Sequence, residues 1–209
     1  MNVRKGEAFN TLTHLIGAIL ALMMLVVLVV VASMQGDPWK IVSFSIYGAT
    51  LFGLYLASTL YHGVNGKWKP LFKIFDHQGI YLLIAGTYTP YTLVVLRGAW
   101  GWSLFGVVWG LAVLGIVLDT LPWIRQRRRV IPIIIYFLMG WSIVIAYQPM
   151  LLNFPVWGLT WLMIGGLCYT FGIVFYALSD RFTYAHGIWH LFVLGGSASH
   201  YVSILFYID

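Results

Sequence analysis

Long apolar runs, separated by short polar or turn-forming segments, dominate the sequence. In a hydrocarbon environment the backbone must satisfy its hydrogen bonds internally, so each run is expected to be a helix. Each is close to the ~20 residues that a helix needs to cross a bilayer. The predicted spans cover residues 10–34, 39–62, 74–97, 101–121, 130–149, 155–178 and 185–207. The pattern predicts an all-α membrane protein, with seven transmembrane helices in a single domain over residues 1–209.

The third predicted span contains residues that affect helix packing. Gly79 and Gly86 allow a neighbouring helix to approach closely, and Pro90 removes one backbone hydrogen bond. We expect close packing along this span and a bend near Pro90. A path for a lipid beside the span is the alternative interpretation of the same residues.

Composition agrees with a membrane protein and excludes several other classes. The chain is 61% hydrophobic and 9% charged, whereas a soluble domain carries about 25% charged residues. The net charge of +6 does not indicate a nucleic-acid partner, because the basic residues lie in loops between apolar runs. Membrane lipids, through anionic headgroups, are the expected partners.

Lysine and arginine are distributed unevenly between the two ends of the predicted spans. Ten of the twelve basic residues fall at the N-terminus or in loops on the same side. These are Arg4, Lys5, Lys67, Lys69, Lys73, Arg125, Arg127, Arg128, Arg129 and Arg181. Only Lys40 and Arg97 fall on the other side. Basic loops stay in the cytoplasm, so we expect the N-terminus to be cytoplasmic and the C-terminus outside.

Polar residues that can bind metal gather near the ends of four predicted spans. Glu7, Asn10 and His14 share one helix face by their spacing, and Ser58 and His62 end the second span. Asp76 and His77 begin the third span, and His186 and His190 lie one turn apart at the start of the seventh. The predicted topology places all four groups at the cytoplasmic end. Two histidines one turn apart can bind one metal ion, so a metal site is expected there.

Ordinary structural roles are the alternative for several of these residues. Glu7 and Asn10 are also typical of a first helical turn, and Ser58 can bond a carbonyl one turn back. His200 lies roughly 15 Å beyond His190 along the same helix, so we expect a buried hydrogen-bonding residue and not a ligand. His77 is adjacent to Asp76, so its ring is expected to point away from the site. Polar groups within spans are costly in lipid, which favours a functional role for the cluster.

Five segments of the sequence resemble the hemolysin III family, within the progestin and adipoQ receptor superfamily. They are Glu7–His14, Ala57–His62, Phe75–Tyr81, Ala85–Tyr91 and His186–His190. The resemblance implies seven helices with a cytoplasmic N-terminus, and zinc held by His62, His186 and His190. It places Asp76 and Ser58 beside the metal, through a water or a supporting contact. The chain looks like a bacterial inner-membrane member.

Three histidines leave a zinc coordination position open, which is typical of catalytic sites. The leading hypothesis is a zinc-dependent hydrolase that cleaves a lipid amide or ester in membrane lipid homeostasis. Asp76 and Ser58 are the candidate catalytic residues, with Glu7, Asn10 and His14 in support. A non-enzymatic lipid or membrane-state sensor with a structural zinc is the first alternative. A cytolytic or pore protein is the second alternative. The spans show no repeated polar face that could line a conduit, so this alternative is ranked last.

Overall fold

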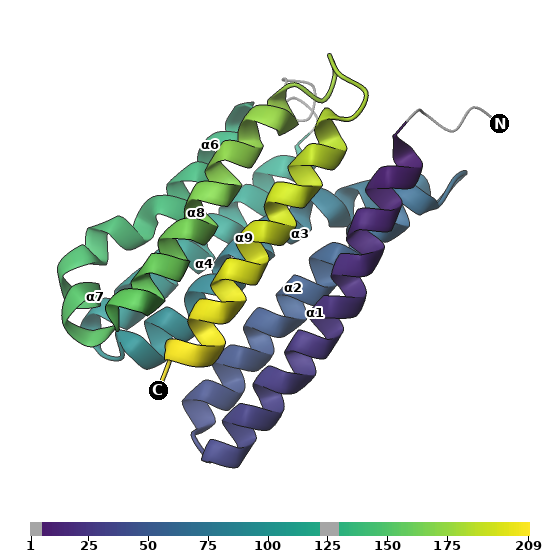
Figure 1. Cartoon of the computed structure of the whole chain (residues 1–209). Coiled ribbons are helices and arrows are strands. Elements are labelled where there is room, and N and C mark those ends of the chain that lie inside the picture. Colours follow the sequence, from purple (N-terminus) through teal and green to yellow (C-terminus); the bar gives the residue numbers. More distant parts are fainter. Residues whose placement is uncertain (1–5, 122–129) are drawn as a thin grey trace.

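The structure, a computed structural model, describes residues 6–121 and 130–209. The long helices of this part of the chain lie side by side in one bundle (Figure 1). They are α1 (Glu7–Gln35), α2 (Pro38–Gly63), α3 (Lys69–Pro90), α4 (Ala99–Thr120), α6 (Val130–Trp141), α8 (Val156–Ala177) and α9 (Ala185–Tyr207). The predicted all-α fold with seven long helices is confirmed.

Six helical stretches within the described residues are long and apolar enough to cross a membrane. They are α1, α2, α4, α8, α9 and the stretch Val130–Asn153. The helix α3 is not among them. Its first half carries Lys73, Asp76, His77 and Gln78, which lower the hydropathy of the helix. The least apolar helix is therefore the one that brings an acidic residue to the predicted site.

Two of the spans depart from regular α-helix. Residues Tyr91–Val95, named η1, form a π-helical turn directly after Pro90, whose missing N–H interrupts the α-helical hydrogen bonds. In the fifth span, α6 ends at Trp141 and a 3-10 segment, η2 (Ser142–Ala146), leads into α7 (Tyr147–Asn153). The hydroxyl of Tyr88 donates to the carbonyl of Gly140 at 2.7 Å and accepts from the backbone N–H of Ile143 at 2.9 Å. Tyr88 therefore satisfies backbone groups that the break in the fifth span leaves free.

The glycines of α3 pack against α2. A Cβ atom added at Gly79 would meet Leu54, and one added at Gly86 would meet Thr50. Both neighbours belong to α2. Close helix packing, as expected from the sequence, is confirmed for these two positions.

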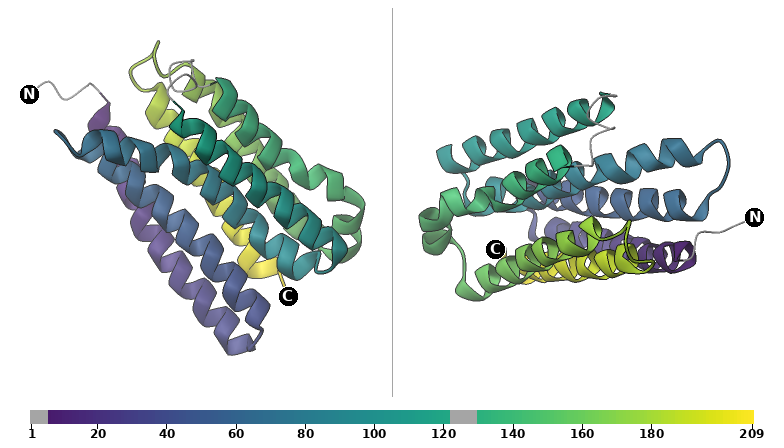
Figure 2. Two further views of the ribbon diagram at one scale, coloured as in Figure 1. Left: turned by 180° about the vertical axis from the view of Figure 1, so that it is seen from behind. Right: turned by 90° about the horizontal axis from the view of Figure 1, so that it is seen from above.

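Neighbouring helices in the chain are also neighbours in space, and α9 closes the arrangement by packing against α8 and α1. The view from above in Figure 2 shows α9 (yellow) beside α1 (purple) and α8 (green). The hydroxyl of Tyr55 on α2 donates to Oγ of Ser197 on α9 at 2.7 Å. Tyr47 donates to the carbonyl of Ser197 at 3.3 Å. Side chains of α2 therefore reach α9 across the interior of the bundle.

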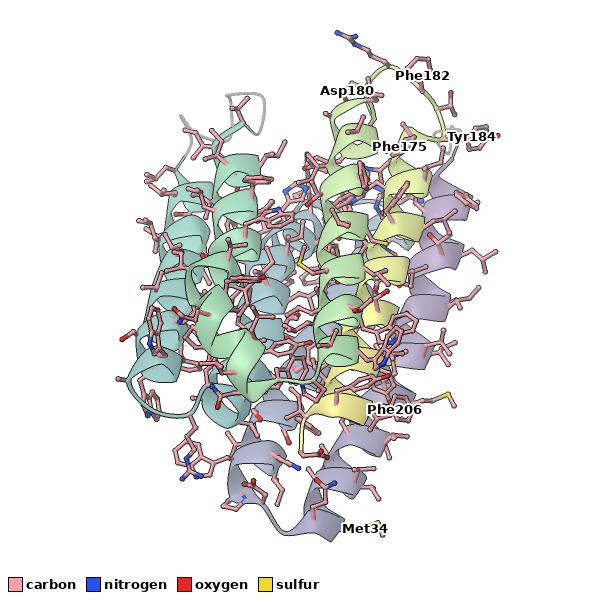
Figure 3. The ribbon with its side chains drawn as sticks, turned by 60° about the vertical axis from the view of Figure 1, so that its left-hand side comes forward. Met34, Phe175, Asp180, Phe182, Tyr184 and Phe206 are labelled. Carbon is pink, nitrogen blue, oxygen red and sulfur yellow. The ribbon has the colours of Figure 1, made fainter. Side chains whose placement is uncertain are left out.

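The starts of α1, α3 and α9 and the end of α2 lie at the same end of the bundle (Figures 1 and 2). In Figure 3, Asp180, Phe182 and Tyr184 of the α8–α9 connection mark this end, while Met34 and Phe206 mark the other. The four polar groups singled out from the sequence therefore lie at similar depth. This arrangement agrees with the predicted topology, although it does not test which end faces the cytoplasm.

Candidate metal centre

Three histidines converge where the end of α2 meets the start of α9. Each of His62, His186 and His190 offers one ring nitrogen, and these atoms all lie within 4.8 Å of one another. Nε2 of His62 lies 3.3 Å from Nε2 of His186. His62 and His190 are buried and His186 is half-buried. The three rings can therefore hold a metal ion, because their donor atoms face a common point.

The Nδ1 atom of His62 is bound by a carboxylate from α1. Oε2 of Glu7 lies 2.6 Å from this nitrogen. An ionised carboxylate can only accept a hydrogen bond, so Nδ1 carries the hydrogen, and in a neutral ring Nε2 keeps its lone pair. Carboxylate–histidine pairs of this kind orient metal ligands and increase their basicity. Glu7, predicted as a supporting residue, contacts the proposed ligand directly.

Hydroxyl groups bind Nδ1 of the other two histidines. Oγ1 of Thr13 lies 3.1 Å from Nδ1 of His190, and its hydrogen is directed at the backbone carbonyls of Phe9 and Asn10. Oγ of Ser179 lies 3.4 Å from Nδ1 of His186 and donates to the carbonyl of Phe175 at 3.1 Å. A hydroxyl has one hydrogen, so an oxygen that donates to a backbone carbonyl is left to accept from its histidine.

The three contacts are consistent with one tautomer in all three rings. In it each Nδ1 carries a hydrogen, and each Nε2 presents a lone pair. Two lone pairs 3.3 Å apart repel unless a cation lies between them. Zn–N bonds of about 2.0–2.1 Å in a tetrahedral site place the nitrogens roughly 3.3 Å apart. The spacing of His62 and His186 therefore fits a tetrahedral metal ion, and His190 offers a third nitrogen within 4.8 Å of theirs.

A cavity of about 140 Å³ is lined by two of the three histidines, His186 and His190, and extends toward the middle of α9. Its walls come mainly from α3, α6, α8 and α9, and most are apolar. They include Leu83, Ile84, Phe137, Leu162, Ile173 and Val193. The polar lining includes His14, Ser58 and Asp76 at the end nearest the metal centre and His200 further along α9. The cavity therefore has a polar end and an apolar body, as an amphiphilic ligand requires.

The two candidate catalytic residues both line this cavity. Asp76 is buried in the first half of α3. Ser58 is fully buried, and its Oγ has no hydrogen-bond partner among the described residues. The expected alternative, a bond from Ser58 to a carbonyl one turn back, is absent in the part of the chain that the structure describes. A buried hydroxyl without a partner leaves donor capacity for a water or a ligand.

The other two supporting residues occupy different places. His14 stacks on His190, with ring centroids 3.5 Å apart and an interplanar angle of 10°. Neither ring nitrogen of His14 has a partner among the described residues. Asn10 is buried, and its side-chain oxygen lies against Gly187 of α9. Both residues pack the start of α1 against the helix that carries two of the proposed ligands.

His200 is buried and lies outside the group of ligand atoms, as expected. His77 also lies outside that group, but it lines the same cavity as Asp76. Nε2 of His200 donates to the carbonyl of Leu162 at 3.1 Å, so this ring has the opposite tautomer. The carbonyl of His77 accepts from the hydroxyl of Tyr136 at 3.0 Å. The residues that sequence reasoning missed are Thr13 and Ser179. Thr13 shares a helix face with Asn10, which is a weak signal, whereas Ser179 lies in a loop and has none.

Comparison with known proteins identifies the family. The Haemolysin-III related family matches residues 3–201 of the chain. The chain belongs to this family. Hemolysin-3 of Bacillus cereus is 43% identical over 205 residues, which cover 98% of this chain and 92% of that protein. The Hemolysin-3 homolog of Bacillus subtilis is 41% identical over 204 residues, 97% of this chain and 94% of the relative.

The relatives of this Haemolysin-III related chain extend beyond bacteria. The monocyte to macrophage differentiation factor of Homo sapiens is 31% identical over 181 residues, which cover 84% of this chain and 74% of that protein. The resemblance inferred from the five sequence segments is confirmed. The family match covers all three histidines of the candidate metal centre.

Proposed function

We propose that this protein is a zinc-dependent membrane hydrolase that cleaves a lipid amide or ester. One observation carries the proposal: three imidazoles, each with a hydrogen-bond partner at Nδ1, bring one ring nitrogen each to within 4.8 Å of one another. Neutral histidine nitrogens are good ligands for zinc, and a three-histidine set leaves one position open. A zinc ion held there would polarise a carbonyl and make a bound water more acidic.

The polar residues of the cavity supply the other groups that hydrolysis needs. In this proposal, Asp76 accepts a proton from the attacking water and orients it. The unpartnered hydroxyl of Ser58 donates a hydrogen bond to the developing oxyanion. Both side chains line the same cavity as His186 and His190, which supports a shared site.

The walls of the cavity support a lipid substrate. The body of the cavity is lined by aliphatic and aromatic side chains, which suit an acyl chain. The scissile amide or ester would then lie at the polar end, beside the histidines. We infer a role in membrane lipid homeostasis, with the site near the cytoplasmic face of a bacterial inner membrane. The Bacillus relatives support the bacterial setting, and the basic loops support the orientation.

The test is the substitution Asp76→Asn in purified protein screened against acyl-lipid amides and esters. Turnover is expected to fall roughly 10²- to 10⁴-fold, because general-base catalysis contributes about that much. Zinc content and thermal unfolding should stay near wild type. The matched control is Asp180→Asn, the same change at an exposed loop position (Figure 3), which should keep full turnover. Wild-type turnover in Asp76→Asn would contradict the assigned role.

A structural metal is the second candidate, and the position of the histidines favours it. His62 belongs to α2 while His186 and His190 belong to α9, so a bound ion would tie two helices together across the interior. A non-enzymatic sensor would use this metal link between α2 and α9 to respond to the state of the membrane. In that case Asp76→Asn leaves the zinc content and the unfolding temperature unchanged, whereas loss of any one of the three histidines lowers the unfolding temperature.

A cytolytic activity is the third candidate, because the names of the Bacillus relatives refer to hemolysis. Release of haemoglobin from red cells by the purified protein, undiminished when all three histidines are replaced by alanine, would favour it over the hydrolase.

A further inference from the structure

A basic and aromatic surface lies where α2 turns into α3. We call it the basic corner, and its residues are Lys67, Trp68, Lys69, Leu71, Lys73 and Phe75. The α2–α3 connection lies at the periphery of the bundle, beside the start of α1 (Figures 1 and 2). Trp68 is 53% exposed, Leu71 38% and Phe75 49%. The corner therefore presents large apolar side chains at the end of the bundle that carries the metal centre.

Cationic residues are interspersed with apolar ones along the basic corner. Lysine occupies positions 67, 69 and 73, and tryptophan, leucine and phenylalanine occupy 68, 71 and 75. This composition is typical of a segment that lies in the interface, with aromatic rings among the headgroups and lysines facing anionic lipid. Nζ of Lys67 lies 5.5 Å from the centre of the Trp68 ring, and no acidic side chain pairs with Lys67 within the described ranges. An anion can approach this ammonium group without displacing a carboxylate.

Lys69 connects the corner to the metal centre. Its Nζ lies 3.8 Å from Oε1 of Glu7, and Oε2 of the same carboxylate lies 2.6 Å from Nδ1 of His62. Nζ of Lys69 also lies 5.1 Å from the centre of the Tyr61 ring, the residue before His62. The side chain of Lys69 is 30% exposed and that of Glu7 is 16% exposed. One ammonium group is therefore accessible from the membrane surface and in contact with the partner of a proposed ligand.

We propose that the basic corner binds the phosphate of an anionic phospholipid, and that Lys69 transmits the charge of that lipid to the metal centre through Glu7 and His62. The lysines supply the charge that recognises the phosphate, and the aromatic residues hold the segment at headgroup depth. The phosphate reduces the positive potential at the site and competes with Glu7 for Lys69. Glu7 then becomes a stronger acceptor for His62, so both effects increase the affinity for a divalent cation.

The first experiment measures lipid binding without reference to the metal. Native mass spectrometry of the full chain, released from nanodiscs, counts bound phosphatidylglycerol against phosphatidylcholine. Replacing Lys67, Lys69 and Lys73 together with glutamine should weaken phosphatidylglycerol binding by about fivefold per lysine, and the same triple change to arginine should retain it. Replacing Arg127, Arg128 and Arg129 with glutamine removes equal charge from the α4–α6 connection and should cost much less.

Two results would overturn the lipid assignment. The two glutamine variants, one of the three lysines and one of the three arginines, could lose phosphatidylglycerol binding equally. That result would show general electrostatic attraction and no binding site at the corner. Competition by inorganic phosphate as effective as by phosphatidylglycerol would show that the corner binds a soluble anion.

The second experiment measures the link to the metal and rests on the proposed zinc site. Zinc affinity, from competition with a chelator, should be roughly fivefold higher in nanodiscs that contain phosphatidylglycerol than in phosphatidylcholine alone. The lysine-to-glutamine triple variant should lose this difference. Equal zinc affinity in both lipids would overturn the link while leaving the lipid site intact. A chain that binds no zinc in either lipid contradicts the proposed function, and the first experiment still tests the corner.

Discussion

At the scale of single residues, the three Nδ1 contacts differ in strength. Glu7 gives the shortest contact, 2.6 Å, and is a charged acceptor, whereas Thr13 and Ser179 are neutral acceptors at 3.1 and 3.4 Å. Charge-assisted hydrogen bonds are roughly twice as strong as neutral ones. His62 is therefore the most firmly oriented of the three rings, and His186 the least.

The threonine contact gives a direct prediction. Thr13→Val keeps the shape of the side chain but removes the oxygen that accepts from His190. Zinc affinity is expected to fall roughly tenfold, at the lower end of the usual cost of losing a partner of a metal ligand, and Thr13→Ser should restore it. Chelator competition measures both. Thr11→Val is the control, because Thr11 bonds only the carbonyl of Glu7 in the described structure. Equal losses for Thr11→Val and Thr13→Val would show a general effect on α1.

Site residues that are polar or charged and rare in membrane spans could be predicted from the sequence. Residues whose role depends only on a contact with another helix could not. His62, His186, His190 and Glu7 are costly in or near lipid, so their presence indicated a site. Thr13 is a common helix residue whose hydroxyl also contacts the carbonyls of Phe9 and Asn10 in its own helix. Its contact with His190 depends on how α1 packs against α9, which no local pattern encodes.

At the scale of helices, α8 and α9 meet along a row of buried glycines. Gly158, Gly165 and Gly172 lie seven residues apart on α8, and side chains of α9 fill the space beside them. A Cβ atom at Gly165 would collide with the ring of His200 and with the carbonyl of Gly196. The absence of side chains lets the two helices approach closely. This packing holds the helix that carries His186 and His190.

The glycine row predicts different effects for two adjacent substitutions. Gly165→Ala is expected to destabilise the protein by about 1–3 kcal/mol, because the new methyl group overpacks the contact with His200. Gly166→Ala is the control, since no described atom outside its chain neighbours and the local helix backbone lies within 4 Å of its added Cβ. It should be neutral or stabilising by up to about 1 kcal/mol, because alanine favours helix. Thermal unfolding in detergent measures both, and equal effects would contradict the packing.

Helix positions could be predicted more closely than helix interruptions. The hydrophobic runs gave the span 185–207, which is α9 itself. Pro90 indicated an interruption of the helix near Tyr91, where the π-helical turn lies. No residue indicated the 3-10 segment η2, because Ser142–Ala146 continues an apolar run. The interruption of the fifth span there depends on the hydroxyl of Tyr88, which belongs to another helix. Interruptions caused by tertiary contacts are not visible in local hydropathy.

At the scale of the whole molecule, the helix ends that carry the site meet at one end of the bundle. The same end holds Lys67, Lys69, Lys73 and Arg181 among the described residues. Arg4, Lys5, Arg125, Arg127, Arg128 and Arg129, which complete the predicted basic side, lie outside the described residues. The grouping of site residues at one end was therefore predictable, and the side of the membrane stays a prediction.

Reporter fusions test that orientation. Alkaline phosphatase fused after Asp209 should be active, because this enzyme folds only outside the cytoplasm, and green fluorescent protein inserted in the 125–129 segment should fluoresce. The physical reason is the distribution of lysine and arginine, ten on one side against two on the other. The reverse pattern would contradict both the orientation and a metal centre facing the cytoplasm.

The measurement that tests the account most directly is the zinc content of purified wild-type protein and four single alanine variants. We predict one zinc per chain in the wild type. The variants His62→Ala, His186→Ala and His190→Ala should each lose most of it, because their ring nitrogens share one point. The matched control His200→Ala should keep its zinc, because this ring bonds Leu162 and lies outside the group. Zinc lost from His200→Ala but retained in His62→Ala would contradict the assigned ligands and the hydrolase built on them.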